Sequence, residues 1–416
     1  MNAKRKDAAL EIEKMVKKKV AAGEGNDDIL ALVDTLASKY TRPTCSANER
    51  KGGMLSLAAV AVGLAGSGSL LCQSKVFVER LLPPLLAGAV DADGRVRYYA
   101  LEAVYNVVKS TRPAILAKVP SLFEVLFKLC DDTDTCVQNA TIFVSDLLKD
   151  SIAGSPSYRV GMLLETLVSC MPVQSSDKRR FLLGWISFID SLPTSTEDFV
   201  ASLPDVVPML LAYSGDSVPE VRHPADKQLR HILGDIKGRS VEAPVQDLTQ
   251  ALSDSILNSE DDSTSALPSV LSDASTDSHV KAETLKWLDV LVEQYYRKLG
   301  FTYPKILKCC LKCLDSADFG VQDVALELNG KLQSNLRKTE ELNFLALLDV
   351  AVQKIGSVQE LAKLEALKWT ALLMKTDYIA AKQIKPLVLH SLCDALSSAS
   401  DEVVQQAVVV LVRTII

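Results

Sequence analysis

The chain has 416 residues, is 48% hydrophobic and carries a formal net charge of −6. This length exceeds what one hydrophobic core usually supports, so several domains or an array of repeats are expected. The lack of a basic excess argues against nucleic acid as the main partner. Nine cysteines without regular spacing indicate reduced thiols in a cytosolic protein. The longest apolar stretch, residues 54–65, is too short to form a transmembrane segment.

A pattern of about 40 residues recurs along the chain, with an apolar run, an acidic turn and a second apolar run. In the clearest copy, Leu81 to Leu86 precede a turn at Asp91 to Arg97, and Tyr98 to Tyr105 follow it. The residues just after each turn are Val96, Val137, Lys178, Val221, Val280, Val321, Leu361 and Val403, which lie 40 to 43 residues apart except for one interval of 59. This period, with two helical runs in each copy, is typical of HEAT or armadillo repeats.

The expected fold is therefore all-α, a right-handed α-solenoid of HEAT/armadillo-like helical repeats without a β-sheet. The pattern places second helices of four pairs near residues 97–110, 137–149, 179–191 and 280–294. Asp and Ser residues in the turns are expected to cap these helices, since their side chains can accept hydrogen bonds from free N–H groups.

The interval of 59 residues predicts an interruption in an otherwise continuous solenoid. We assign residues 1–237 to N-terminal HEAT repeats, residues 238–278 to an irregular segment and residues 279–416 to further HEAT repeats. The irregular segment contains an acidic, serine-rich loop around Ser259, whose phosphorylation would add charge that recruits or repels a basic partner. The apolar end near Ile416 lacks the polar cap of a terminal repeat, which suggests that the array continues beyond it.

Residues that could support catalysis do not converge in this sequence. There are only four histidines, and two of them, His223 and His279, lie in or beside turns of different repeats. Cys310 and Cys313 have neither a second cysteine pair nor a nearby histidine. These two cysteines lie in an apolar helical run, which favours buried thiols over metal ligands. We therefore expect a protein that is not an enzyme, with no catalytic residue, cofactor or metal.

Two aromatic regions are candidates for packing or binding. Trp185 lies on the apolar stripe of a second helix, which predicts a structural core residue between repeats. Arg95, Arg97, Tyr98 and Tyr99 open another second helix. Arg97 can pair with Asp91 or Asp132 along the stack. Alternatively, the group can bind a partner, because arginine and tyrosine are enriched in protein interfaces.

Three segments carry a resemblance to a known family: Arg50-Lys51-Gly52-Gly53, the block from Asp91 to Asn106, and Arg180 to Pro193. They resemble the ArPIKfyve-type vacuole-morphology HEAT-repeat scaffolds, specifically their N-terminal half. Leu10 to Lys14 and Asp401 to Val404 are similar too.

The resemblance implies a non-catalytic scaffold that holds a phosphatidylinositol 3-phosphate 5-kinase of the PIKfyve/Fab type together with a Sac-type phosphoinositide phosphatase. Such a complex controls phosphatidylinositol 3,5-bisphosphate, and the protein would be cytosolic and peripheral on endosomal or vacuolar membranes. The family's regions for phosphatase binding and self-association are expected beyond Ile416. The alternative is another HEAT-repeat interaction scaffold, of the nuclear-transport or phosphatase-scaffold type.

The resemblance is strongest between residues 50 and 149, so the kinase-binding face is expected there, across consecutive repeats. Phe143 and Leu147, four residues apart on one helix, are included although a core role is the alternative for both. The candidates for partner binding, or for holding the binding face in shape, are Arg50, Lys51, Arg95, Arg97, Tyr98, Tyr99, Phe143 and Leu147.

Overall fold

The computed structural model describes residues 2–23, 26–193, 195–238, 244–258, 274–376, 389, 391–393 and 395–415. Every regular element in these ranges is a helix, and none of them contains a strand. The predicted all-α fold of helical repeats is thus confirmed. The loop predicted around Ser259 lies outside the described residues. The chain divides into two compact units, unit 1 at Met1–Phe199 and unit 2 at Val200–Ile416.

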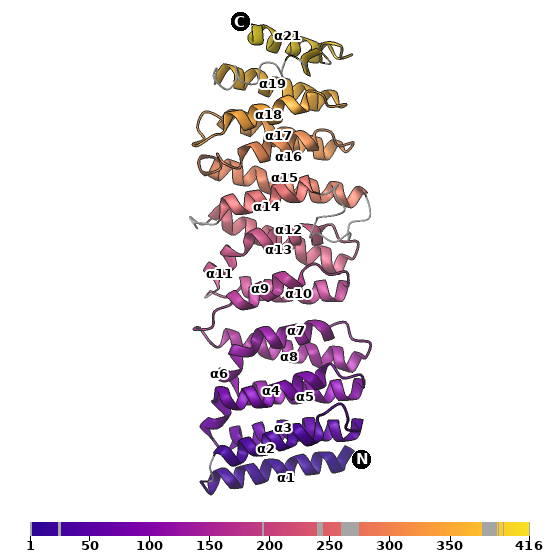
Figure 1. Cartoon of the computed structure of the whole chain (residues 1–416), viewed down its shortest axis with the longest axis vertical. Coiled ribbons are helices and arrows are strands. Elements are labelled where there is room, and N and C mark those ends of the chain that lie inside the picture. The colour runs from indigo at the N-terminus through magenta and orange to yellow at the C-terminus, as the bar shows by residue number, and fades with distance from the viewer. Residues whose placement is uncertain are drawn as a thin grey trace. The chain divides into compact units, whose positions relative to one another are not determined.

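Unit 1 is built from antiparallel helix pairs that follow one another along the chain (Figure 1). The first helices of the pairs are α2 (Asn26–Tyr40), α4 (Lys75–Ala89), α7 (Val119–Leu129) and α9 (Gly161–Cys170). Their second helices are α3 (Ala47–Gly66), α5 (Gly94–Ser110), α8 (Thr135–Ala153) and α10 (Ser176–Asp190). The helix α1 (Asn2–Ala21) packs on α3, which packs on α5, and α5 packs on α8. Short helices at Leu70–Gln73, Arg112–Ile115 and Leu116–Lys118 connect the pairs.

Unit 2 repeats this arrangement. Its first helices are α12 (Leu203–Ser214), α14 (Val245–Leu257), α16 (Tyr303–Cys313) and α18 (Phe344–Lys354), each in contact with the next. Their second helices are α13 (Pro219–Gly238), α15 (Ala274–Tyr295), α17 (Phe319–Asn335) and α19 (Glu360–Thr376). The helix α21 (Asp401–Ile415) packs on α19. A short helix, α11 (Thr196–Ala201), lies where the units meet in the sequence.

The four second helices predicted from the sequence are present as α5, α8, α10 and α15. The recurring residue that follows each acidic turn lies one or two positions after the first residue of its helix in seven of the eight repeats. In the eighth repeat, α15 begins six residues before Val280. The spacing of the acidic turns therefore located the helices to within a few residues.

The core of unit 1 contains an aromatic cluster centred on Trp185 of α10. Trp185 is fully buried, and its ring lies 5.5 Å from that of Phe123 on α7, measured between centroids. Phe181 and Phe188 lie 6.5 Å and 6.0 Å away, and the Lys149 ammonium lies 5.1 Å above the indole. The cluster joins helices from two successive repeats.

The cysteines of α16 are buried as free thiols. Cys310 and Cys313 both lie in the core of unit 2, next to the buried Cys309. Burial raises the pKa of Cys310 well above its usual value, so this thiol stays protonated at neutral pH. Protonated, buried thiols act as small apolar side chains.

Candidate partner-binding site

The turns between α4 and α5 and between α7 and α8 each contain two aspartates with different contacts. The Asp91 carboxylate accepts a hydrogen bond from the Asp93 N–H at 2.8 Å and closes the turn. Asp93 caps α5, accepting from the N–H groups of Arg95 at 2.8 Å and Val96 at 3.1 Å. The next turn has the same design, with Asp132 bonded to the Asp134 N–H at 2.9 Å and Asp134 capping α8. The pattern Asp-x-Asp therefore both forms the turn and starts the second helix.

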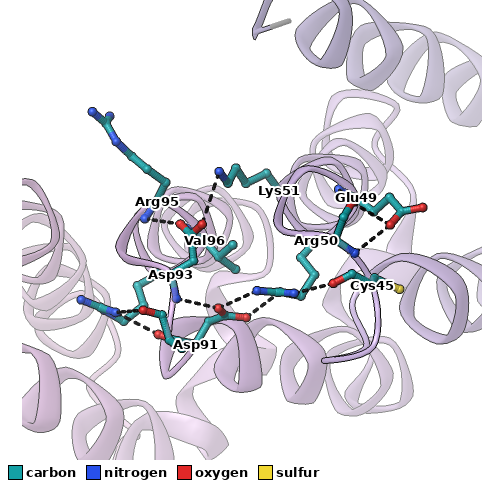
Figure 2. Close-up of polar contacts among 11 residues, drawn as sticks. Cys45, Glu49, Arg50, Lys51, Asp91, Asp93, Arg95 and Val96 are labelled. Atoms are coloured by element: carbon teal, nitrogen blue, oxygen red, sulfur yellow. Dashed lines mark hydrogen bonds and ion pairs between the residues drawn. The ribbon is translucent and has the colours of Figure 1, made fainter.

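Arginines from one repeat reach the first aspartate of the next turn. Arg50 on α3 contacts both carboxylate oxygens of Asp91, at 2.7 Å and 2.9 Å, and also donates to the Cys45 carbonyl (Figure 2). Arg97 on α5 binds both carboxylate oxygens of Asp132 at 2.8 Å. These bidentate pairs are mostly buried and join consecutive repeats. We call the Arg50–Asp91 and Arg97–Asp132 pairs the arginine ladder.

Three of the four charged candidates for partner binding form contacts within the chain. Arg97 binds Asp132 with its side chain and donates to the Asp91 carbonyl at 2.9 Å, so it contacts both residues suggested by the sequence. Lys51 lies 3.7 Å from the Asp93 carboxylate. By contrast, the exposed Arg95 side chain extends away from these contacts (Figure 2). Arg50, Lys51 and Arg97 therefore position the helices, whereas Arg95 faces solvent.

The contacts in these turns also shift the pKa values of two aspartates, Asp132 and Asp93. Burial alone would raise the pKa of Asp132, but the hydrogen bonds from Arg97 and from the Asp134 N–H, together with the charge of Arg97, outweigh it and lower that pKa below its usual value. The pKa of Asp93 is also lowered, because the N–H groups at the start of α5 and the charge of Lys51 outweigh the effect of burial. Both carboxylates are thus ionised at neutral pH, as their contacts require.

An open groove of about 420 Å³ lies between α5 and α8. We call it the α5–α8 groove, and its walls are Tyr98, Leu101, Glu102, Tyr105, Cys136, Asn139, Ala140 and Phe143. Phe143 is 66% exposed, and its neighbour Ile142 is exposed as well. Burial raises the pKa of Tyr98, so its hydroxyl remains protonated and can donate a hydrogen bond. The groove thus combines apolar rings with a few polar groups, as binding sites usually do.

The structure separates the uncharged candidates into two groups. Tyr98 and Phe143 line the groove, whereas Tyr99 and Leu147 are buried in the core and do not line it. The core alternative for the pair on α8 is therefore right for Leu147, which is 8% exposed, and wrong for Phe143.

Six further groove residues were not candidates from the sequence: Leu101, Glu102, Tyr105, Cys136, Asn139 and Ala140. A signal for two of them was present, since Tyr98, Glu102 and Tyr105 are spaced by four and three residues on one helix face. No such spacing links them to Cys136 and Asn139, which come from the following repeat.

In the described part of the chain, no helix is both long and apolar enough to cross a bilayer.

Residues 48–150 match the family described as the Vacuolar 14 Fab1-binding region. This segment covers α3 to α8 almost completely and includes both the arginine ladder and the α5–α8 groove. A structure titled "Kap95:Nup1 complex" aligns with 99% of this chain and 55% of its own, at 15% identity and a TM-score of 0.35.

Two relatives are similar in sequence. "Protein VAC14 homolog" of Arabidopsis thaliana is 31% identical over 409 residues, which cover 96% of this chain and 50% of that protein. "Vacuole morphology and inheritance protein 14" of Saccharomyces cerevisiae is 28% identical over 257 residues, 53% of this chain and 28% of the yeast protein. The chain spans about half the length of the plant relative, and the matched part is a smaller share of the yeast relative's length. From these matches, the chain belongs to the VAC14 family.

Proposed function

We propose that this chain is a non-catalytic scaffold that binds a phosphatidylinositol 3-phosphate 5-kinase of the Fab1/PIKfyve type. The observation that carries the proposal is the position of the α5–α8 groove inside the segment that matches the Fab1-binding region. The proposal extends to control of phosphatidylinositol 3,5-bisphosphate on endosomal and vacuolar membranes, with the protein attached peripherally. We further propose that binding of a Sac-type phosphatase and self-association depend on parts of the family's length that this chain does not span.

The groove has the features of a protein-docking site. Its two walls come from consecutive repeats, which is how helical solenoids build their binding surfaces. Tyr98 and Phe143 offer aromatic surface, and aromatic residues dominate the energetics of many interfaces. The exposed Ile142 beside Phe143 extends the apolar area beyond the groove.

The arginine ladder holds in place the helices that form this surface. Arg97 and Asp132 tie the start of α5 to the turn that precedes α8, so the two groove walls are held relative to each other. A surface that is fixed before binding loses less conformational entropy when the partner docks. We therefore place Arg50, Lys51, Arg97 and the buried Tyr99 and Leu147 in the supporting frame, with Tyr98, Phe143 and the nearby Arg95 available to the kinase.

The test compares two arginine substitutions in the purified chain, using quantitative recovery of the purified kinase. Phe143→Arg should weaken kinase binding about tenfold or more, equivalent to ~1.4 kcal/mol, because a charge replaces the ring in the groove. Phe301→Arg is the matched control, since Phe301 is 80% exposed and lies in unit 2. Arg95→Glu should also weaken binding, by removing a cation beside the groove.

The two outcomes are distinct. Wild-type recovery of the kinase by a Phe143→Arg variant that circular dichroism shows to be folded would exclude the groove as the docking site. Failure of the wild-type chain to bind the kinase, together with recovery of importin cargo or a protein phosphatase, would instead favour a different kind of HEAT-repeat scaffold.

A further inference from the structure

A second cavity, of about 540 Å³, lies in unit 2 and is rich in lysine. Its walls come from α14, α15, α16 and α18 and from the turn that follows α16. The charged residues on these walls are Lys281, Lys308, Lys312, Lys354 and Asp315. We call this cavity the lysine pocket. It lies outside residues 48–150, so nothing about it depends on the proposed kinase site.

The charge of the lysine pocket is opposite to that of the chain as a whole. Acidic residues outnumber lysine and arginine by 52 to 46 in the sequence, yet the pocket gathers four lysines around a single carboxylate. Like charges brought together in a concave site repel one another and raise the local positive potential. An anionic ligand relieves that repulsion.

Contacts with the surrounding helices hold two of these lysines in place. The Lys312 ammonium donates to the carbonyls of Ile256 at 3.2 Å and Leu257 at 3.0 Å, in the last turn of α14. Lys354 forms an ion pair with Asp315, which also accepts a hydrogen bond from the Ser357 hydroxyl. The pocket's one carboxylate is therefore already matched by a lysine and a hydroxyl.

The other two lysines complete the positive wall. Lys308 is exposed and lies one helical turn before Lys312 on α16, so both ammonium groups project from the same face. Lys281 is half-buried and comes from α15. Ser316 and Gln353, which also line the pocket, supply neutral hydrogen-bonding groups.

We propose that the lysine pocket binds a compound that carries two or more phosphate groups. Ammonium groups bind phosphate as compact point charges, and four of them on three helices match several phosphates better than one. The cavity is also within the size range of small-molecule sites. The same chemistry is offered by a soluble polyphosphorylated compound and by the headgroup of a phosphorylated lipid.

The experiment uses the 416-residue chain and two probes. Inositol hexakisphosphate is titrated by calorimetry, and vesicles of phosphatidylcholine, with or without a bisphosphorylated phosphoinositide, are tested by flotation. The wild-type chain should bind at least one of these probes, with an affinity that falls as salt is added. Lys281→Gln/Lys308→Gln should weaken that binding about tenfold or more.

The matched control is Lys227→Gln/Lys286→Gln, which removes the same charge from exposed positions of α13 and α15 outside the pocket. The single variant Lys308→Glu, at an exposed position, repeats the test where the fold is least at risk. Binding of the soluble probe supports a free phosphate compound as ligand, and binding to the vesicles alone supports a lipid headgroup. No binding in either arm, or equal loss in the pocket and control variants, would overturn the proposal.

Discussion

The aromatic side chains of unit 1 include a fully buried group and an exposed one, for which we expect different roles. Trp185 and Phe123 are fully enclosed in the core, whereas Phe143 is two-thirds exposed on the wall of the α5–α8 groove. Trp185 and Phe143 both lie on second helices, α10 and α8. Substitution therefore tests stability at the first group and binding at the second.

Trp185→Ala should lower the free energy of unfolding by about 3–5 kcal/mol, because it removes a large, fully buried ring and leaves a cavity. Urea denaturation followed by circular dichroism measures this change. Phe143→Ala serves as the comparison and should change stability by less than about 0.5 kcal/mol, since its ring is largely solvated. Equal stability of the Trp185→Ala variant and the wild-type chain would contradict the packing described around the indole.

Cys136 should report occupation of the groove. Its thiol is exposed on the groove wall, so a maleimide reagent should label it in the free chain. Bound kinase should slow this labelling, as measured by mass spectrometry. Cys393 is an internal control, because it is exposed in unit 2 and should be labelled at the same rate with or without kinase. Unchanged labelling of Cys136 in the complex would place the kinase elsewhere on the chain.

The helix pair is the recurring element of unit 1, and two consecutive pairs, α4–α5 and α7–α8, share an Asp-x-Asp turn. The first aspartate closes the turn and receives an arginine from the preceding repeat, and the second starts the next helix. In unit 2, Ser316 and Asp318 divide the turn and cap functions in the same way, with Asp318 capping α17. Asp315, which precedes Ser316 in this turn, forms an ion pair with Lys354 and accepts a hydrogen bond from the Ser357 hydroxyl.

Asp132→Asn should reduce stability at neutral pH by about 1–3 kcal/mol, because it weakens a charge-assisted, mostly buried pair. The sign of its pH dependence follows from the lowered pKa of Asp132 in the folded chain. A carboxylate with a lowered pKa stabilises the fold above its unfolded pKa, and this contribution is lost as the pH falls through the folded value. Wild-type stability should therefore fall more steeply than that of Asp132→Asn below about pH 4. Parallel urea-denaturation curves for the two proteins from neutral to acidic pH would contradict this role.

The helix positions could be predicted because the signals for them are local. Each acidic turn and the residue that follows it lie within a few positions of the helix they start, as Asp93 and Val96 do for α5. The exposure of Phe143 could not be predicted in the same way. Phe143 and Leu147 are four residues apart, and four residues turn a helix about 40° past a full circle. Which of the two side chains is buried therefore depends on how the neighbouring helices pack against α8. The lysine pocket left no local signal either, since Lys281 and Lys354 are 73 residues apart.

On the scale of the molecule, stability should be distributed unevenly along the chain. Helical repeats contact mainly their neighbours, so a local defect spreads through adjacent repeats and not through a shared core. The two compact units provide a natural comparison, since the cluster around Trp185 lies in unit 1 and the lysine pocket in unit 2.

Trp185→Ala should accelerate amide hydrogen exchange in α7, α8, α9 and α10 and leave exchange in α16, α17 and α18 unchanged. The reason is that local opening depends on the contacts nearest to the defect. Mass spectrometry of peptides from the two units measures both regions in one sample, and the peptides of α16 act as the control. A uniform increase over the whole chain would show that the molecule unfolds as one cooperative body.

The arginine ladder also bears on how such a chain can change its length during evolution. Asp91 and Asp132 are 41 residues apart and make the same two contacts, one with the turn and one with an arginine. Loss of residues 92–132 would join Asp91 to Thr133 and Asp134, which restores the Asp-x-Asp turn in front of α8 and leaves Arg50 with its aspartate. Asp91 and Asp132 are interchangeable in this respect. Loss of this 41-residue repeat would therefore leave no arginine or aspartate of the arginine ladder without its partner, because Arg97 and Asp132 are removed together.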